Sequence, residues 1–142
     1  AVGQKGTIRR MSNGAARGEV IDAPTQESLH GIGGTGPNDV WAVGDAATIL
    51  HWDGTAWSPS LAAFALGKKP NLYGIWGSAP NDVWAVGDYG TILHFDGTSW
   101  QRSTASLPVG RKPHLYGVWG SAEDDVWVVG EGIVLHFTGA KK

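Results

Sequence analysis

The chain is built from a repeat of 43 residues. The stretch "LYGIWGSAPNDVWAVGDYGTILHFDGTSW" (72–100) recurs upstream as "LHGIGGTGPNDVWAVGDAATILHWDGTAW" (29–57) and downstream as "LYGVWGSAEDDVWVVGEGIVLHF" (115–137). Trp41, Trp84 and Trp127 mark the period. Residues 1–11 match 42–52, so we expect the chain to open within a repeat and not at a natural start. Self-similarity with a period in this range is typical of repeat architectures.

Each repeat contains four short apolar segments separated by clusters of Gly, Pro, Asn and Asp, which favour turns. In the second full repeat we expect strands A to D at 72–77, 82–87, 91–95 and 99–103. Strand B is apolar on both faces, because Val83 and Ala85 alternate with Trp84 and Val86. A sheet buried on both faces needs neighbours on both sides, and radially stacked identical sheets supply them. The sequence therefore predicts an all-β fold of four-stranded antiparallel meanders, arranged as the blades of a β-propeller.

The repeat boundaries divide a single domain, residues 1–142, into a partial blade (1–28), two blades (29–71 and 72–114) and a second partial blade (115–142). Propellers close with about four to eight blades. One chain therefore makes an incomplete ring. We expect Trp76 and Trp119, on strand A of their repeats, to pack between blades.

Two motifs connect the repeat to known families. The turns "HWDGTAW" and "HFDGTSW" are similar to the Asp-Gly-x-x-Trp turn of sialidase-type Asp-box propellers and photosystem II assembly-factor propellers. The "WGSxxxDVWAVG" text resembles bacterial repeat proteins grouped with kelch-like propellers. The resemblance covers essentially the whole chain and implies a propeller. It also favours a bacterial extracellular or periplasmic location, which the residues themselves leave open.

Composition narrows the classes of partner and cofactor. The 142 residues are 42% hydrophobic with a net charge of -2, which is typical of a globular protein and favours neither a nucleic acid nor a membrane partner. With no Cys there is no disulfide framework and no Cys-based zinc site. The Gly-rich string "GIGGTG" (31–36) is not followed by a helical pattern, so no phosphate-binding loop and no cofactor are predicted.

The polar residues of the repeat favour structural roles. We interpret His51, His94 and His136 as histidines bonded to nearby turns, because equivalent positions in successive blades are too far apart to share one metal ion. The recurring Asp residues indicate turn chemistry; they are Asp39, Asp82, Asp125, Asp53 and Asp96. An active site needs different groups that converge once. No such cluster is visible, and we predict that the chain is not an enzyme.

Loop variation indicates where a ligand would bind. Strand order places the A–B and C–D turns on one face of the disc and the B–C and D–A loops on the other. The first pair is nearly constant between repeats and the second varies, and binding residues concentrate on variable loops of a rigid scaffold. We therefore predict a binding face for a glycan, as in a lectin, or for a peptide. Its candidate residues are Asp45, Asp88, Tyr89, Glu131, Lys68, Lys69, Arg111 and Lys112.

Three alternatives stay open at this point. The same charges can form a solvated rim without a ligand. The chain can also be a structural or engineered propeller fragment. A sialidase-like, glycan-active enzyme would need an arginine cluster, whereas the arginines here are scattered; they are Arg9, Arg10, Arg17, Arg102 and Arg111.

Incomplete terminal blades also predict self-association, because unpaired strand edges and apolar blade faces template contacts with other chains. We expect a homo-oligomer, with a dimer favoured, whose subunits complete one another's terminal blades by strand complementation. If strand D of one chain (18–23) joins the last three strands of another, the dimer has six blades. If both ends stay incomplete blades, it has eight.

Overall fold

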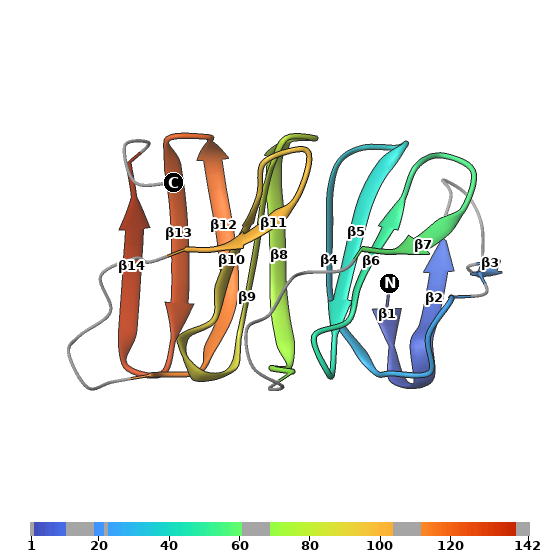
Figure 1. The fold of residues 1–142 in the computed structure, drawn as a ribbon, viewed down its shortest axis with the longest axis horizontal. Coiled ribbons are helices and arrows are strands. Elements are labelled where there is room, and N and C mark those ends of the chain that lie inside the picture. The colour runs from blue at the N-terminus through green and yellow to red at the C-terminus, as the bar shows by residue number, and fades with distance from the viewer. Residues whose placement is uncertain (1, 11–18, 22, 61–68, 104–111, 139–142) are drawn as a thin grey trace.

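The computed structural model describes residues 2–10, 19–21, 23–60, 69–103 and 112–138. These residues form four antiparallel sheets that follow one another in chain order (Figure 1). Among the described residues no helix is long and apolar enough to cross a bilayer. The fold is all-β and is that of β-propeller blades, as the sequence predicts.

Two of the sheets have four strands and two have three. The sheets comprise β1 (Val2–Gly3), β2 (Thr7–Arg10) and β3 (Glu19–Ile21); β4 (Leu29–Gly36), β5 (Asp39–Gly44), β6 (Ile49–Trp52) and β7 (Trp57–Pro59); β8 (Leu72–Ala79), β9 (Asp82–Gly87), β10 (Ile92–Phe95) and β11 (Trp100–Arg102); and β12 (Leu115–Ala122), β13 (Asp125–Gly130) and β14 (Ile133–Phe137). Strand A runs two residues further than expected in the second full repeat, and strand D is two residues shorter.

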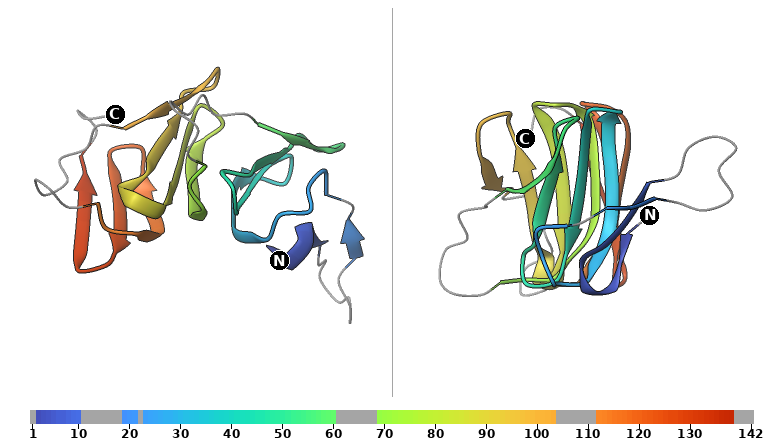
Figure 2. Two further views of the ribbon diagram at one scale, coloured as in Figure 1. Left: turned by 60° about the horizontal axis from the view of Figure 1, so that its bottom comes forward. Right: turned by 90° about the vertical axis from the view of Figure 1, so that its right-hand side faces the viewer.

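The first strands β4, β8 and β12 contact one another from sheet to sheet, and the last strands β7 and β11 lie along one side of the array (Figure 2). Within each sheet the strands form a meander in which every strand pairs with its sequence neighbour. The turns that join β4 to β5, β8 to β9 and β12 to β13 therefore lie on one face. The turns that follow β5, β9 and β13 lie on the opposite face (Figure 1).

The residues of strand β9 are buried on both sides. Trp84 and Val86 belong to the core shared with the sheet β12–β14, where Val126 and Phe137 pack against them. Val83 and Ala85 belong to the core shared with the sheet β4–β7, together with Trp41. This division confirms that a central blade buries both faces of its sheet against its neighbours.

The recurring His and Asp residues form one network in each sheet. His94 Nε2 lies 2.7 Å from Asp82 Oδ1, and the Ser78 hydroxyl donates to the other carboxylate oxygen of Asp82. His51 with Asp39, at 2.5 Å, and His136 with Asp125, at 2.6 Å, repeat the arrangement. The histidines are therefore bonded to the A–B turns, as expected, and they tie strand C to the start of strand B.

The Asp-Gly motif builds the turn between strands C and D. Asp53 Oδ1 accepts hydrogen bonds from the amides of Thr55 (2.8 Å) and Ala56 (3.0 Å), and Asp96 does the same in the next blade. Gly54 has a φ of 102°, in the region that favours glycine. The motif thus has the turn role that the sequence predicts.

Candidate functional site

The turns between strands B and C carry the acidic candidates. Backbone hydrogen bonds join these turns to the segment just before strand A of the same blade. The amides of Asp45 and Asp88 each donate to a carbonyl just before strand A, those of Ser28 and Asn71, at 2.9 Å. The amide of Glu131 donates in the same way to the His114 carbonyl, at 3.0 Å. Three acidic side chains are therefore held at equivalent points of three neighbouring sheets.

These turns also hold left-handed backbone. Among the described residues, every non-glycine residue with positive φ lies in a B–C turn: Lys5, Ala46, Ala47 and Tyr89, with φ between 53° and 57°. Such conformations are strained for residues with a side chain, and they persist where surrounding contacts fix them. Lys5 and Tyr89 are each followed by a glycine with positive φ, and Ala46 by Ala47, which is the pattern of a tight two-residue hairpin turn.

A row of rings runs beside the acidic residues on the inner strands. His30 on β4, Tyr73 on β8 and Tyr116 on β12 each follow the Leu that begins strand A. The ring centroids of His30 and Tyr73 are 5.4 Å apart, and those of Tyr73 and Tyr116 are 5.3 Å apart. The three residues make a continuous aromatic ladder across three blades, because successive rings lie within contact distance.

Each ring of the ladder is paired with the acidic residue of its own blade. His30 Nε2 lies 2.6 Å from Asp45 Oδ1, and the Tyr116 hydroxyl donates to Glu131 Oε1 at 3.3 Å. Burial raises the pKa of Tyr73, and its hydrogen bond to Asp88 raises it further. The pKa of Tyr116 is raised by desolvation and by the Glu131 carboxylate. Both tyrosines therefore stay neutral hydrogen-bond donors near neutral pH.

Asn71 and His114 connect neighbouring blades on the same face. Asn71 Oδ1 accepts the Ala46 amide of the preceding blade at 3.0 Å. His114 Nδ1 lies 3.1 Å from Asp88 Oδ1, and its ring stands 5.1 Å from the Tyr89 ring. The Tyr89 amide donates to the same Nδ1 atom at 3.3 Å. These bridges fix the relative position of adjacent B–C turns.

The sequence candidates divide into three groups. Asp45, Asp88 and Glu131 come together with the ladder, and Tyr89 is 54% exposed beside His114. Lys69 and Lys112 are exposed in the chain leading to strand A, and no ion pair joins them to the acidic residues within the described part of the chain. Lys68 and Arg111 lie outside the described residues.

The residues that sequence reasoning missed are the rings and bridges: His30, Tyr73, Tyr116, Asn71 and His114. The signal was present, because the position after the first Leu of each repeat is His, Tyr and Tyr, while the flanking Leu and Gly do not change. A polar aromatic residue at a variable position between constant ones indicates exposure.

The opposite face has a different character. An open depression of about 540 Å³ lies between the A–B turns of two blades, lined by Trp76, Ser78, Ser121 and Glu123 among others. Across the described residues, no three His, Asp or Glu side chains are grouped so that they could hold a metal ion. The His–Asp networks lie at this end of the sheets, where they brace the A–B turns.

The fold and the repeat together define a partial β-propeller. No family model matches the chain, and no curated protein matches it. Two similar solved structures are a YCF48 bound to D1 peptide (21% identity, TM-score 0.76) and YCF48 from Cyanidioschyzon merolae (15% identity, TM-score 0.70). They align with 95% and 97% of this chain. The chain spans about half of their length, 44% of the first and 49% of the second.

Proposed function

We propose that this chain is a non-enzymatic propeller module that binds a peptide on the face formed by the B–C turns and the D–A loops. The observation that carries the proposal is the aromatic ladder flanked by acidic residues. Tyr116 and Glu131 are each about half exposed at its open end. A ligand that reaches this face meets rings and carboxylates already held in place by the scaffold.

The chemistry of the ladder suits an extended peptide with basic and aliphatic side chains. Aromatic faces contact aliphatic stems and attract the cationic groups of Lys and Arg. Carboxylates such as Asp45 and Glu131 accept hydrogen bonds from those groups and from backbone amides. The similar YCF48 structure was solved with a D1 peptide, which supports a peptide over a glycan as the class of ligand here.

Fluorescein-labelled ten-residue peptides of basic, neutral and acidic composition provide the test, with binding to the 142-residue chain followed by fluorescence anisotropy. Tyr116→Ala and Glu131→Gln should each weaken a basic peptide about tenfold. Glu131→Gln removes a charged hydrogen-bond acceptor, worth about 1.5–3 kcal/mol. Tyr116→Ala removes a cation–π contact, worth about 0.5–2 kcal/mol, and 1.4 kcal/mol corresponds to about a factor of ten in affinity. Both residues are exposed, so the variants should keep the parent's fold.

Glu123→Gln is the matched control, because it makes the same change in the same sheet at the opposite face. Equal binding by this control and by the parent is expected. If Glu123→Gln weakens binding and Glu131→Gln does not, the peptide lies on the other face and the assignment is wrong. If no peptide binds while a glycan array gives signals, the class of ligand is wrong.

A further inference from the structure

The junction between neighbouring blades has one constant hydrogen bond on the candidate binding face. The amide at the third position of each B–C turn donates to a carbonyl of the next blade, two residues before strand A begins. The pairs are Gly6 with Glu27 (2.8 Å), Ala47 with Pro70 (2.7 Å) and Gly90 with Pro113 (2.8 Å). Because donor and acceptor both belong to the backbone, this bond does not depend on which side chains the repeat carries there.

A second bond of the junction depends on the side chain just before strand A. Between the sheets β4–β7 and β8–β11, Asn71 Oδ1 accepts the Ala46 amide at 3.0 Å. In the next interface His114 has the same place in the repeat, and its Nδ1 accepts the Tyr89 amide at 3.3 Å. A side-chain amide oxygen is always an acceptor, whereas an imidazole nitrogen accepts only while it carries no proton. The two interfaces therefore have the same bond with different chemistry.

Protonation changes what His114 can do in this place. Histidine is the side chain whose charge changes between about pH 5 and about pH 8. In the neutral ring Nδ1 accepts the amide and Nε2 carries the proton, whereas in the charged ring both nitrogens are donors. A proton on Nδ1 faces the N–H of Tyr89, so the bond between them is lost. The same proton lies near a carboxylate, since Nδ1 and Asp88 Oδ1 are 3.1 Å apart.

The groups around His114 can hold a cation. Asp88 lies in the B–C turn of the preceding blade, and Glu131 Oε1 lies 3.7 Å from His114 Nε2 in its own blade. The other titratable groups around it are Tyr73, Tyr89 and Tyr116 and, two residues upstream and exposed, Lys112. Tyrosines and lysines do not titrate near pH 6. A protonated His114 therefore lies between carboxylates of two successive blades.

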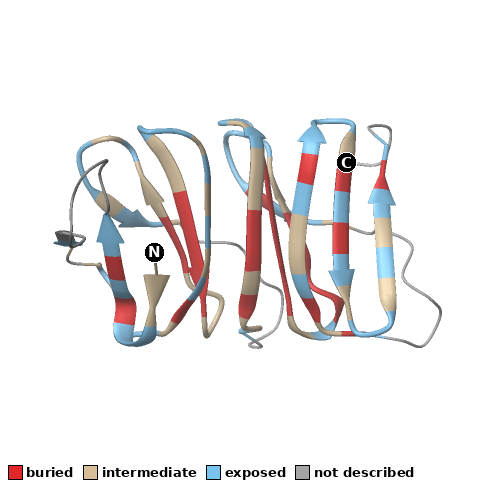
Figure 3. Ribbon diagram, turned by 180° about the vertical axis from the view of Figure 1, so that it is seen from behind, coloured by how far each residue is buried: buried red, intermediate tan, exposed pale blue. Residues whose placement is uncertain are grey.

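We propose that His114 makes the link between the sheets β8–β11 and β12–β14 dependent on pH. Above about pH 7 it holds the Tyr89 turn as Asn71 holds the turn of the preceding blade. Below about pH 6 it releases the Tyr89 amide and becomes an internal cation for Asp88 and Glu131. The backbone bond from Gly90 remains, and strand β9 is buried along its whole length (Figure 3). Acid therefore changes the turn without opening the blades.

One consequence concerns the ligand and rests on the proposed function. A basic peptide and a protonated His114 compete for the same carboxylates, because each supplies a cation to Asp88 and Glu131. Loss of one exposed ion pair changes affinity about threefold. The basic peptide should therefore bind about threefold more weakly at about pH 5.5 than at about pH 8, and a neutral peptide should bind equally at both.

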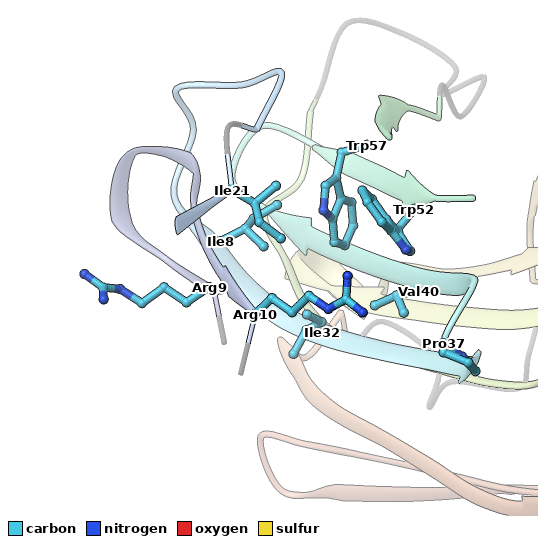
Figure 4. A pocket seen from close by; sticks show the side chains of 9 residues that line it. All are labelled: Ile8, Arg9, Arg10, Ile21, Ile32, Pro37, Val40, Trp52 and Trp57. Carbon is cyan, nitrogen blue, oxygen red and sulfur yellow. The ribbon is translucent and has the colours of Figure 1, made fainter. Parts of the chain in front are cut away.

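A second concave surface provides a check on where the peptide binds. A pocket of about 210 Å³ lies between the N-terminal sheet and the sheet β4–β7 (Figure 4). The residues that line it are apolar apart from Arg9 and Arg10, and an arginine stays charged at both pH values. A peptide held in this pocket would therefore bind equally well at both.

Amide hydrogen exchange measured by NMR tests the link without any peptide. After correction for the intrinsic effect of pH on exchange, protection of the Tyr89 amide should be about fivefold lower at the acid pH, the effect of losing one hydrogen bond. The Gly90 and Ala46 amides should keep their protection, because their acceptors are oxygen atoms. His114→Asn, which copies the preceding blade, should protect the Tyr89 amide equally at both pH values. Asn71→His should transfer the pH dependence to the Ala46 amide.

Fluorescence anisotropy at the same two pH values tests the competition. The threefold loss for the basic peptide should shrink in His114→Asn, whereas His30, which is paired with Asp45, is the same in both proteins. Equal protection of the Tyr89 amide at both pH values, or a loss that persists in His114→Asn, would overturn the inference. Release of the amide with no change in affinity would refute the competition. If no peptide binds at either pH, the proposed function is wrong, and the exchange measurement alone decides the link.

Discussion

Replacement of Trp84 by Ala is the most direct test of the radial stacking of the blades. The Trp84 side chain is fully buried, with ring centroids 4.9 Å from Phe137 and 4.7 Å from His94. Truncation of a buried large aromatic side chain costs about 3–5 kcal/mol, because packing is lost and a cavity remains. At about 2–4 °C per kcal/mol for a chain near this length, the melting temperature should fall by roughly 10 °C.

Trp127→Ala is the matched comparison, since it removes the same side chain from the same repeat position. Trp127 is 39% exposed and stacks on the His136 ring, with the two ring centroids 3.9 Å apart. Within a single chain its loss should lower the melting temperature far less than the loss of Trp84. Both variants are melted by circular dichroism at a concentration where light scattering shows equal masses, because assembly itself adds stability. Equal melting temperatures for Trp84→Ala and the parent would refute the interior position of strand B.

Three smaller changes test the turns. Tyr89→Ala on the proposed binding face should change the free energy of unfolding by about 0.5 kcal/mol or less, and a larger loss in urea unfolding would contradict the assignment of faces. Gly97→Ala should destabilise by roughly 1–3 kcal/mol, because φ is 99° and the new Cβ would stand 2.9 Å from Asn81; a parent-like urea midpoint would argue against this turn. The Thr55 amide, then the Thr55 hydroxyl and the Ala56 amide, lower the pKa of Asp53 from 3.8 to about 2. The stabilising contribution of Asp53 is complete above pH 4 and is lost as the pH falls to 2, so the melting-temperature difference between parent and Asp53→Asn should shrink over that range, and a constant difference would contradict the turn geometry.

The sequence predicted the blade because the interior of a blade is set by alternation and turn chemistry, both local properties. The apolar alternation at Val83 and Trp84 and the Asp-Gly turn at Asp53 each have the structural role expected. The sequence predicts turn roles for the recurring His and Asp residues but does not predict that they pair. His94 and Asp82 are 12 residues apart, and their contact depends on the register of β9 against β10.

The residues singled out from the sequence include the acidic members of the candidate site and leave out its rings. Asp45 and Asp88 stand in variable loops, where sequence comparison between repeats draws attention to them. Tyr73 and Tyr116 lie on strand A, which the sequence predicts to be an interior strand of the fold. Their ladder is created by inner strands of separate blades that lie side by side, so it depends on how blades stack and not on any single repeat.

Stacking therefore gives equivalent residues different roles. Trp84 has the same sequence context as Trp127, but only Trp84 has a blade on its open side, so one is core and the other is exposed apolar surface. The inner face follows the same logic, since Tyr73 has a ring on either side of it, whereas Tyr116 contacts the ring of Tyr73 alone within the described ladder. In a repeat protein the role of a residue is decided by its neighbouring blade as much as by its own sequence. The candidate site is an example of that property, because its rings come from inner strands of separate blades.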